Sequence, residues 1–435
     1  MNREMKDSGI PWLGEYPAKW ELKRIQFTLQ ERIENNSPIR SRDILSLTAK
    51  QGVVPLSEKE GGGNKPKEDY SAYRLAYPGD IVMNSMNILS GSVGLSKYFG
   101  CVSPVYYMLR PLESGDDVRF YNYIFQTTVF QKSLYGLGNG ILIKESGNGK
   151  LNTIRMRIPM DKFKKLYIPV PNTEIQHRIA DFLDSKCSQI DEISKKIQEE
   201  IDTLEEYKKS VITEAVTKGL DPNVEMKDSG IEWIGEIPES WSINRVANVF
   251  CERNEPGENG LPFLSVSINS GISDKELSEE ETNRQFIRAE AKKNKKVYPG
   301  DIVYNMMRAW QGAIGAVRTE GMVSSAYVTA KPMQKIDTRY FEYLLRTPTA
   351  IQEMNKYSYG IMDFRKRLYW PYFKNISLCV PPLSEQAAIA NYADKITLTT
   401  DSFVSSKREQ LSVLEEYKKS LIYEYVTGKK EVAYA

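Results

Sequence analysis

The sequence has very little of the side-chain chemistry on which most enzymes depend. His177 is the single histidine among 435 residues, whereas zinc hydrolysis, histidine-assisted nucleophiles and facial-triad iron sites need more of them. We interpret His177 as a cap or surface residue. The four cysteines lie far apart and form no CxxC pair, which indicates a reduced, cytoplasmic protein. No phosphate-binding GxxxxGK[ST] loop is present, so ATP hydrolysis would belong to another chain.

Long apolar runs are also missing. No stretch of 18 or more apolar residues could span a membrane, and the N-terminal MNREMKDSGI contains no secretory signal. Neither sign of charge is in excess, because the formal net charge is +2. A nucleic-acid partner would therefore have to meet local basic faces rather than a basic molecule. The length is sufficient for two or three globular domains.

What the sequence does contain is an internal repeat, which is the first feature to look for in a chain of this length. Residues 5–20 and 226–241 are identical at eleven of sixteen positions, at an offset of 221. The same offset superimposes YPGDIV at 77–82 on YPGDIV at 298–303, whereas LEEYKKS recurs at an offset of 210. The first copy therefore holds about eleven extra residues, which we place in the Gly-rich stretch 136–150.

The two copies share their landmarks but differ between them. Residues 22–76 and 243–297 have little in common, although both begin after a Trp and end at YPGDIV. A constant frame with different contents predicts one fold that presents two different binding surfaces. We therefore interpret shared residues as framework and differing residues as candidates for recognition. By this reasoning, the repeated tryptophans are packing residues, namely Trp12, Trp20, Trp233 and Trp241.

Two long helices are predicted over 173–218 and 383–427, because neither range contains proline or glycine. Each follows a Pro-containing turn, and Thr173 and Ser384 are the expected capping hydroxyls. Apolar residues recur every seven positions, which predicts that the helices pair as an antiparallel coiled coil. The expected rows are Leu183, Ile190, Ile197, Leu204 and Val211 flanked by Ile179, Ile193 and Tyr207, then Ile389, Ile396, Phe403 and Tyr417, and finally Ala393, Leu414 and Leu421, a row that Thr400 and Lys407 interrupt.

The remaining regions mix strand-like and helical runs. Residues 80–83 and 104–109 are strand-like, whereas 121–135 and 340–357 have helical patterns. The sequence thus predicts an α+β fold, with two globular domains related by the repeat and separated by two long antiparallel helices. The expected divisions are 1–170, the helix 171–219, 220–380 with a linker at 220–225, and the helix 381–428.

The ordered set of these features resembles the specificity subunits of type I restriction-modification systems. It consists of DSGIxWxGExPxxW at the head of each half, PGD followed by apolar residues, and a Pro-rich turn with Glu-Gln opening a long helix. The Glu-Gln pair is intact only at Glu385-Gln386, since the first copy has Glu174-Ile175-Gln176. The resemblance covers essentially the whole chain.

The resemblance implies a non-catalytic DNA-binding subunit. Each globular half would be a target recognition domain for one part of a bipartite, asymmetric DNA sequence, and the helices would set the spacer. Two modification (methyltransferase) subunits would dock on the helices, and restriction subunits would join through them. S-adenosylmethionine, ATP and magnesium would be needed by those partner subunits and not by this chain.

Candidate DNA contacts come from two places in each half. One is the Gly-rich insertion and its counterpart, where Arg155 aligns with Arg365 and Arg157 with Arg367; the other is the segment after GDIV. Arginine can bind phosphate or guanine, and Asn and Gln can read adenine. The alternatives are a solvated basic surface or an intramolecular ion pair for the basic cluster, and a strand end whose amides bind the local backbone for the segment after GDIV. The candidates are Asn84, Asn87, Lys144, Lys150, Arg155, Arg157, Asn305, Arg308, Gln311, Arg365, Lys366 and Arg367.

The repeated LEEYKKS has two interpretations. Its charged pairs are typical of a solvated helix face, but a duplicated docking surface explains better why the segment stays identical while its neighbours differ. The docking candidates are Glu205, Glu206, Tyr207, Lys208, Glu415, Glu416, Tyr417 and Lys418.

Two other classes of protein remain as alternatives. A metal-dependent nuclease could use Asp274 with Glu290 and Lys292, although the first copy has no counterpart. A coiled-coil scaffold without DNA contact would leave the two large divergent domains unexplained. A methyltransferase is not indicated, because residues 380–383 (VPPL) lack the amide or acid and the aromatic of its target-base tetrapeptide.

Overall fold

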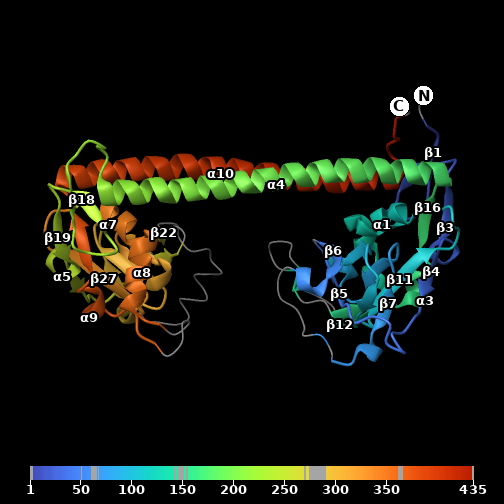
Figure 1. Ribbon diagram of the computed structural model, residues 1–435, viewed down its shortest axis with the longest axis horizontal. Helices are drawn as coiled ribbons and strands as arrows, with labels where there is room; N and C mark the ends of the chain where they lie inside the picture. The colour runs from blue at the N-terminus through green and yellow to red at the C-terminus, as the bar shows by residue number, and fades with distance from the viewer. Residues whose placement is uncertain are drawn as a thin grey trace. The chain divides into compact units, whose positions relative to one another are not determined.

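The computed structural model describes residues 3–49, 51–59, 66, 68–141, 144–145, 151–152, 155–268, 271–273, 291–360 and 366–433. The chain forms two compact units. Unit 1 comprises Met1–Ile197 and Glu409–Ala435, and unit 2 comprises Gln198–Arg408. Each unit contains a globular α+β part and a stretch of two long helices, α4 (Thr173–Lys218) and α10 (Leu383–Val426) (Figure 1).

The globular part of unit 1 is built around a four-stranded antiparallel sheet with the order β4-β11-β8-β9. Three short helices and several 3-10 turns surround it. The strands are β1 (Met5–Asp7), β2 (Glu15–Pro17), β3 (Glu21–Arg24), β4 (Leu29–Arg32), β5 (Leu45–Thr48), β6 (Gly52–Pro55), β7 (Arg74–Ala76), β8 (Ile81–Asn84), β9 (Val93–Leu95), β10 (Gly100–Val102), β11 (Tyr106–Pro111), β12 (Asn139–Ile141), β13 (Lys144–Glu145), β14 (Leu151–Asn152), β15 (Arg155–Arg157) and β16 (Tyr167–Val170). The helices are α1 (Val118–Gln126), α2 (Thr128–Ser133) and α3 (Met160–Phe163), with 3-10 turns η1 (Ile25–Phe27), η2 (Leu56–Glu58), η3 (Tyr70–Ala72), η4 (Ile88–Ser90) and η5 (Tyr135–Leu137).

Unit 2 repeats this topology, with a sheet of the order β20-β27-β24-β25. The smaller pairs recur as well, since β3 with β16 and β5 with β6 have counterparts in β19 with β28 and β21 with β22. Its strands are β17 (Met226–Asp228), β18 (Glu236–Pro238), β19 (Ser242–Arg245), β20 (Phe250–Arg253), β21 (Ser265–Ser267), β22 (Gly271–Ser273), β23 (Lys295–Val297), β24 (Ile302–Asn305), β25 (Ile314–Ala316), β26 (Gly321–Val323), β27 (Tyr327–Pro332) and β28 (Ser377–Val380). Its helices are α5 (Val246–Val249), α7 (Thr338–Leu345), α8 (Pro348–Lys356) and α9 (Trp370–Phe373), with η6 (Ala291–Lys293) and η7 (Ala309–Gln311). The predicted α+β fold with an internal repeat is confirmed.

The sheet in each unit is covered on both faces. Successive side chains of a strand point to opposite sides, so Ile81 of β8 packs in the main core of unit 1 while Val82 packs in a second cluster. In unit 2, Ile302 and Val303 of β24 divide in the same way. Burial on both faces explains why these strands have continuous apolar runs instead of alternation.

The acid in each YPGDIV segment forms a structural clamp. Asp80 accepts a hydrogen bond from the Tyr77 amide at 2.9 Å and pairs with Arg32 at 2.9 Å. Asp301 accepts from the Tyr298 amide at 3.0 Å and pairs with Arg253 at 3.0 Å. Burial raises the pKa of the Asp301 carboxyl, and the Tyr298 amide and Arg253 oppose that shift. The repeat of YPGDIV is therefore explained by folding.

The four tryptophans of the head motif are buried, as predicted for packing residues. Trp20 packs edge-on against Phe120 with ring centroids 6.3 Å apart. Trp241 packs in the same way against Tyr340 at 6.2 Å. The head motif therefore anchors the start of each copy to the helix that follows the sheet.

Each of the two shorter predicted helices is in fact a pair. The segment predicted as helical at 121–135 is divided into α1 and α2 at Thr127, and the one at 340–357 is divided into α7 and α8 at Thr347. Both threonines adopt extended backbone angles. In unit 2 the new helix starts with Pro348, a residue favoured at the first helical position.

The two long helices have the predicted extents and pair antiparallel within each unit (Figure 1). In unit 1, Phe182 stacks on Tyr425 with centroids 4.5 Å apart, and Asp191 pairs with Lys418. In unit 2, Lys208 pairs with Asp401. The predicted caps were wrong, because the Asn172 side chain accepts from the Ile175 amide and Ser384 lies inside α10.

One row of each predicted seam is shifted by one residue. Ile193 and Tyr207 are 48% and 54% exposed, and Phe403 and Tyr417 are 57% and 52% exposed. The seam continues instead through the residues one position later, several of which are small or polar and so escape an apolar pattern. Its buried members include Ala180, Cys187, Ile201 and Ala215 of α4 and Ala390 and Val404 of α10.

The extra residues of the first copy lie where the Gly-rich composition predicts. Seventeen residues separate Asn139 from its strand partner Arg157, whereas seven separate Tyr359 from its bridge partner Arg367. Ten of the eleven additional residues are therefore inserted between these paired positions. Among the described helices, none is both long enough and apolar enough to cross a membrane.

Candidate nucleic-acid interface and docking surface

The turn after the central strand begins with a shared asparagine in both units. The Asn84 side chain accepts a hydrogen bond from the Met86 amide, and the Asn305 side chain accepts one from the Met307 amide, both at 3.0 Å. Asn84 is buried. These contacts are the ones expected of a strand end that satisfies its local backbone, and they fit the structural alternative for this pair.

The next candidates in the same turn differ between the units and face solvent. Asn87 precedes η4 in unit 1, and Arg308 occupies the equivalent position before η7 in unit 2. Both side chains are exposed, as is Gln311 at the end of η7. An amide in one unit and a guanidinium in the other would present different hydrogen-bonding groups to base edges.

Backbone hydrogen bonds bring the second candidate set beside this turn. The Ile158 amide donates to the Ser85 carbonyl at 2.9 Å, and the Leu368 amide donates to the Met306 carbonyl at 2.8 Å. The residues just before them, Arg157 and Arg367, are exposed. Each unit therefore assembles the turn after its central strand and an exposed arginine into one surface, which we call the reading surface.

Lys366 is partly committed to contacts within unit 2. Its ammonium donates to the Asn355 side chain at 3.0 Å and lies 6.0 Å from the centre of the Trp310 ring. The Trp310 ring nitrogen in turn donates to the Met307 carbonyl at 3.0 Å. These contacts tie the segment carrying Arg367 to the turn carrying Arg308.

The other basic candidates are only partly described. Lys144 and Arg155 belong to β13 and β15, but their side chains lie outside the described residues, as do Lys150 and Arg365 altogether. The nuclease alternative cannot be assembled from described residues. Asp274 and Glu290 lie outside them, Lys292 is exposed in η6, and the described part of the chain contains no cluster of His, Cys, Asp or Glu that could hold a metal.

The repeated LEEYKKS segment divides its side chains between the helix seam and the outside. Lys208 lies in the seam, with its ammonium 2.6 Å from Asp401, and Lys418 lies 2.6 Å from Asp191. Tyr207 and Tyr417 are exposed on the flank, together with the glutamates before them. Glu205 is exposed but reaches across to Arg408 of α10 at 2.9 Å. The docking candidates that remain on the outer face are Glu206, Tyr207, Glu415, Glu416 and Tyr417.

Two exposed apolar residues that precede this motif on the long helices were assigned to the seam by sequence reasoning. Ile193 and Phe403 lie fourteen residues before Tyr207 and Tyr417 respectively, so heptad geometry places each pair on the same flank of its helix. An apolar pattern gives no signal for the true seam here, because Lys208 and Lys418 occupy the neighbouring row and are held there by ion pairs with Asp401 and Asp191.

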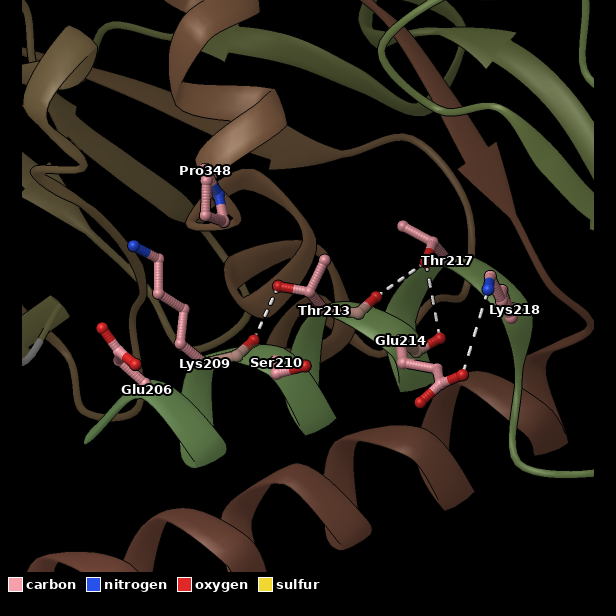
Figure 2. Close-up of a pocket in the computed structure, with 8 residues that line it drawn as sticks. All are labelled: Glu206, Lys209, Ser210, Thr213, Glu214, Thr217, Lys218 and Pro348. Carbon is pink, nitrogen blue, oxygen red and sulfur yellow. Dashed lines mark hydrogen bonds and ion pairs between the residues drawn. The ribbon is translucent and has the colours of Figure 1, made fainter. Parts of the chain in front are cut away.

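An open pocket of about 540 Å³ adjoins the docking motif in unit 2. Figure 2 shows Lys209 and Thr213 of α4 on the side that faces Pro348 at the start of α8. In unit 1, the residue equivalent to Thr213 is Tyr423, whose hydroxyl donates to the Trp12 carbonyl at 3.1 Å. The lining residues are Glu206, Lys209, Ser210, Thr213, Glu214, Thr217, Lys218 and Pro348.

Comparisons with known proteins point in one direction. The family model described as the type I restriction modification DNA specificity domain matches residues 37–203 and 234–412. The putative type I restriction enzyme MjaX specificity subunit of Methanocaldococcus jannaschii is 22% identical over 97% of this chain and 96% of its own length. The MjaVIII specificity subunit of the same organism is 27% identical over 62% of this chain and 63% of its own length. A solved chain from work on complex assembly and conformational transition of the type I R-M system has a similar fold, with a TM-score of 0.67 at 14% identity over 95% of this chain and 99% of that one.

Proposed function

This chain belongs to the type I restriction-modification DNA specificity family, and we propose that each unit reads one half of a bipartite, asymmetric DNA target. The observation that carries this proposal is the contrast within the reading surface. The framework around it is the same in both units, whereas the exposed residue at the same position is Asn87 in one and Arg308 in the other. Two readers of one shape but different chemistry suit a target with two unlike halves.

Each reading surface supplies both kinds of contact that sequence-specific binding needs. Arg157 and Arg367 can bind phosphate and hold the protein in register, which confers no sequence preference. Asn87 suits adenine, and Arg308 and Gln311 suit guanine and adenine. Asn84, Asn305 and Lys366 would act by shaping this surface, while Lys144, Lys150, Arg155 and Arg365 would extend it.

The paired helices would set the spacer and bind the partners. In this proposal, residues 1–170 and 220–380 are the target recognition domains, and 171–219 and 381–428 are the helices between them. Two modification subunits dock on the duplicated outer face around Tyr207 and Tyr417, and restriction subunits join through them. S-adenosylmethionine, ATP and magnesium serve those partners, and the complex acts on DNA in the cytoplasm.

Domain exchange tests the modular assignment. Replacing residues 22–160 with those of a related chain should change one half of the methylated sequence, because the other reading surface is untouched. The matched control replaces residues 243–370 and should change the other half. Sequencing of methylated DNA from the assembled complexes measures both. Changes in both halves, or in neither, contradict the proposal.

Two point substitutions test the reading and docking residues separately. R308A should relax the preference at one base pair by about 1–3 kcal/mol, the typical value of a bidentate contact, while leaving the first half-site unchanged. Y207D and Y417D should weaken capture of the modification subunits without lowering the unfolding midpoint, since both tyrosines are exposed. If a chain carrying both Y207D and Y417D still captured the modification subunits fully, the docking surface would lie elsewhere.

A further inference from the structure

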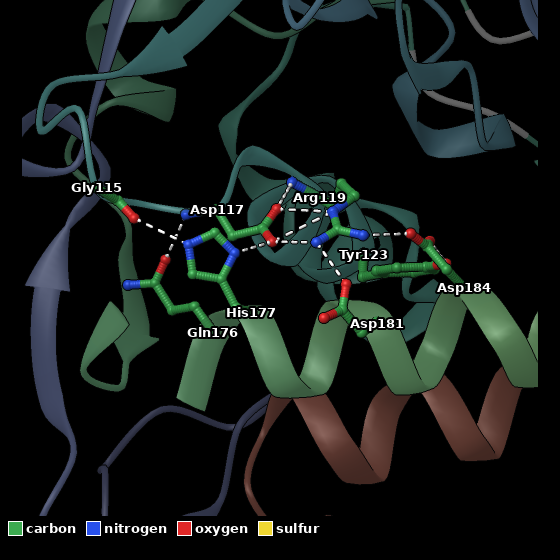
Figure 3. Close-up of polar contacts among 8 residues, drawn as sticks. All are labelled: Gly115, Asp117, Arg119, Tyr123, Gln176, His177, Asp181 and Asp184. Carbon is green, nitrogen blue, oxygen red and sulfur yellow. Dashed lines mark hydrogen bonds and ion pairs between the residues drawn. The ribbon is translucent and has the colours of Figure 1, made fainter. Parts of the chain in front are cut away.

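Arg119 joins the globular part of unit 1 to the long helix. Its guanidinium lies 2.5 Å from the Asp117 carboxylate, and Asp117 is the residue that caps α1. The nitrogen that makes this contact, Nη2, also lies 2.8 Å from Asp181, and Nη1 lies 2.7 Å from Asp184, both on α4 (Figure 3). One side chain therefore connects the start of α1 to two turns of α4.

Neighbouring hydrogen bonds complete this contact. The Gln176 side chain accepts from the Asp117 amide at 3.0 Å, and the Tyr123 hydroxyl donates to Asp184 at 2.6 Å (Figure 3). His177 lies 2.8 Å from Asp117 and 3.2 Å from the Gly115 carbonyl. Burial acts to raise the pKa of the Asp117 carboxyl, but the hydrogen bonds from Arg119 outweigh it and leave that pKa lowered.

Most of these contacts recur in unit 2, where Asn391 and Ala387 replace Asp181 and His177. Arg339 lies 2.6 Å from Asp337 and 2.7 Å from Asp394 of α10. The Gln386 side chain accepts from the Asp337 amide at 2.9 Å, and the Tyr343 hydroxyl donates to Asp394 at 2.7 Å. We call these two sets the junction networks. The spacing Asp-x-Arg-x-x-x-Tyr, present at 117–123 and 337–343, was the sequence signal for them.

The junction networks connect mechanically to the reading surfaces. In unit 1, α1 packs on β9, and only Gly91 and Ser92 separate β9 from η4 and its Asn87. In unit 2, α7 packs on β25, which follows η7 and Arg308 after Gly312 and Ala313. A change in the angle at which α1 or α7 meets its long helix would therefore move the reading surface.

The chemistry of these networks suits positioning better than adhesion. The partners of Arg119 on α4 are largely exposed, with Asp181 at 68% and Asp184 at 46%, and exposed ion pairs contribute little to stability. Each unit is already stabilised by a large apolar core of its own. A guanidinium, by contrast, is planar and binds carboxylates in a fixed fork, so it restricts the angle between the groups that it joins. Duplication of such a network at both junctions indicates that the angle itself matters.

We propose that Arg119 and Arg339 are positioning residues that hold each globular part at one angle on its helix and thereby restrict the spacer length that the complex accepts. This inference rests on the proposed function, because it requires two half-sites read at a set separation. Neither arginine needs to touch DNA. Their loss would widen the range of accepted spacers while both half-sites are still read.

The test uses the assembled complex of this chain with its modification subunits. Methylation rates are measured on duplexes that carry both half-sites with the native spacer, or with a spacer one base pair shorter or longer. R119A and R339A should each reduce the preference for the native spacer by roughly three- to tenfold, because small displacements of positioned groups change rates steeply. The bases required in each half-site should stay the same.

R40A is the matched control, since it removes an arginine ion pair with Glu34 in unit 1 that is not part of the junction network. It should leave the spacer preference unchanged. Y123F removes a single hydrogen bond from the network and should widen the spacer preference less than R119A, which keeps the test decisive if R119A does not fold. If R119A and Y123F lower the rate equally on all spacers, or leave the spacer preference unchanged, the inference about the junction networks is overturned while the proposed function stands. A wild-type complex without a bipartite preference would overturn the proposed function as well.

Discussion

Units 1 and 2 are alike in the contacts that hold them together and different in the residues that they expose. The clamp between Arg32 and Asp80 recurs as Arg253 with Asp301, and the seam pair of Asp191 and Lys418 recurs as Asp401 and Lys208. The two units differ across residues 22–76 and 243–297, in the exposed turn after the central strand and by the insertion between Asn139 and Arg157. This contrast would allow a duplicated chain to change what each copy binds while keeping the same fold.

The docking surfaces show a second, smaller difference. Tyr423 fills space and binds the Trp12 carbonyl in unit 1, whereas Thr213 in unit 2 donates to the Lys209 carbonyl of its own helix. The pocket in unit 2 lies beside the shorter Thr213 side chain. Two copies of one partner would therefore meet surfaces that are equivalent around the exposed tyrosines but not beyond them.

The largest effects should come from the shared tryptophans. W20A and W241A should each lower the free energy of unfolding by roughly 3–5 kcal/mol, the usual range for removing a buried aromatic side chain. The two residues are 3% and 1% exposed, so the losses should agree closely. Denaturant unfolding followed by circular dichroism measures both. A loss in only one unit would show that the head motifs are not equivalent.

The corrected seam gives the next prediction. L183A should cost roughly 2–5 kcal/mol because Leu183 is fully buried. I193A should cost less than about 0.5 kcal/mol, because Ile193 is 48% exposed and surface substitutions have small effects. The same unfolding measurement compares them. If L183A and I193A lowered the free energy of unfolding by similar amounts, Ile193 would belong to the seam, as the apolar pattern predicted.

These two cases show where sequence reasoning succeeded. Identical segments such as YPGDIV fixed the equivalence of the two copies, and uninterrupted runs without proline or glycine located both long helices. The seam was misplaced because lysine and small residues occupy real seam positions at 180, 187 and 208, where a hydrophobic pattern cannot recognise them. The reading surface depends on hydrogen bonds between distant segments, such as Ile158 to Ser85, which spacing alone does not reveal.

Glu342 and Asn122 offer a comparison that depends on pH. They occupy equivalent buried positions in α7 and α1. Burial raises the pKa of the Glu342 carboxyl, with Arg346 opposing the shift. When folding raises the pKa of a carboxyl, the folded protein becomes less stable as the pH rises above the ordinary pKa of that carboxyl, which is 4.5 for glutamate.

E342Q should therefore make unit 2 more stable at neutral pH, with the gain disappearing below the ordinary pKa of glutamate. Urea unfolding at pH 7.5 and pH 4 measures the difference, and N122A serves as a control whose effect should not change with pH. A loss of stability in E342Q at neutral pH would mean that the ion pair with Arg346 outweighs the cost of burial.

The smallest effects should come from the seam pairs, and here the two units should agree most closely. Asp401 and Asp191 are 56% and 63% exposed, while their lysines are 27% and 29% exposed. Solvent screens such pairs, so double-mutant cycles on Lys208 with Asp401 and on Lys418 with Asp191 should each give about 0.2–1 kcal/mol, decreasing with added salt. A coupling several times larger in one unit would show that the two seams are packed differently.

The positions of these two lysines are informative about docking. Because each lysine is held by an aspartate of the opposite helix, K208A and K418A should leave the binding of modification subunits nearly unchanged, whereas Y207D and Y417D should weaken it. The outward tyrosines and the inward lysines belong to the same repeated segment, so this pair of experiments separates its two roles. If the lysine variants lost partner binding while keeping their unfolding midpoint, the lysines themselves would belong to the docking surface, and the pairs with aspartate would have to open when the partner binds.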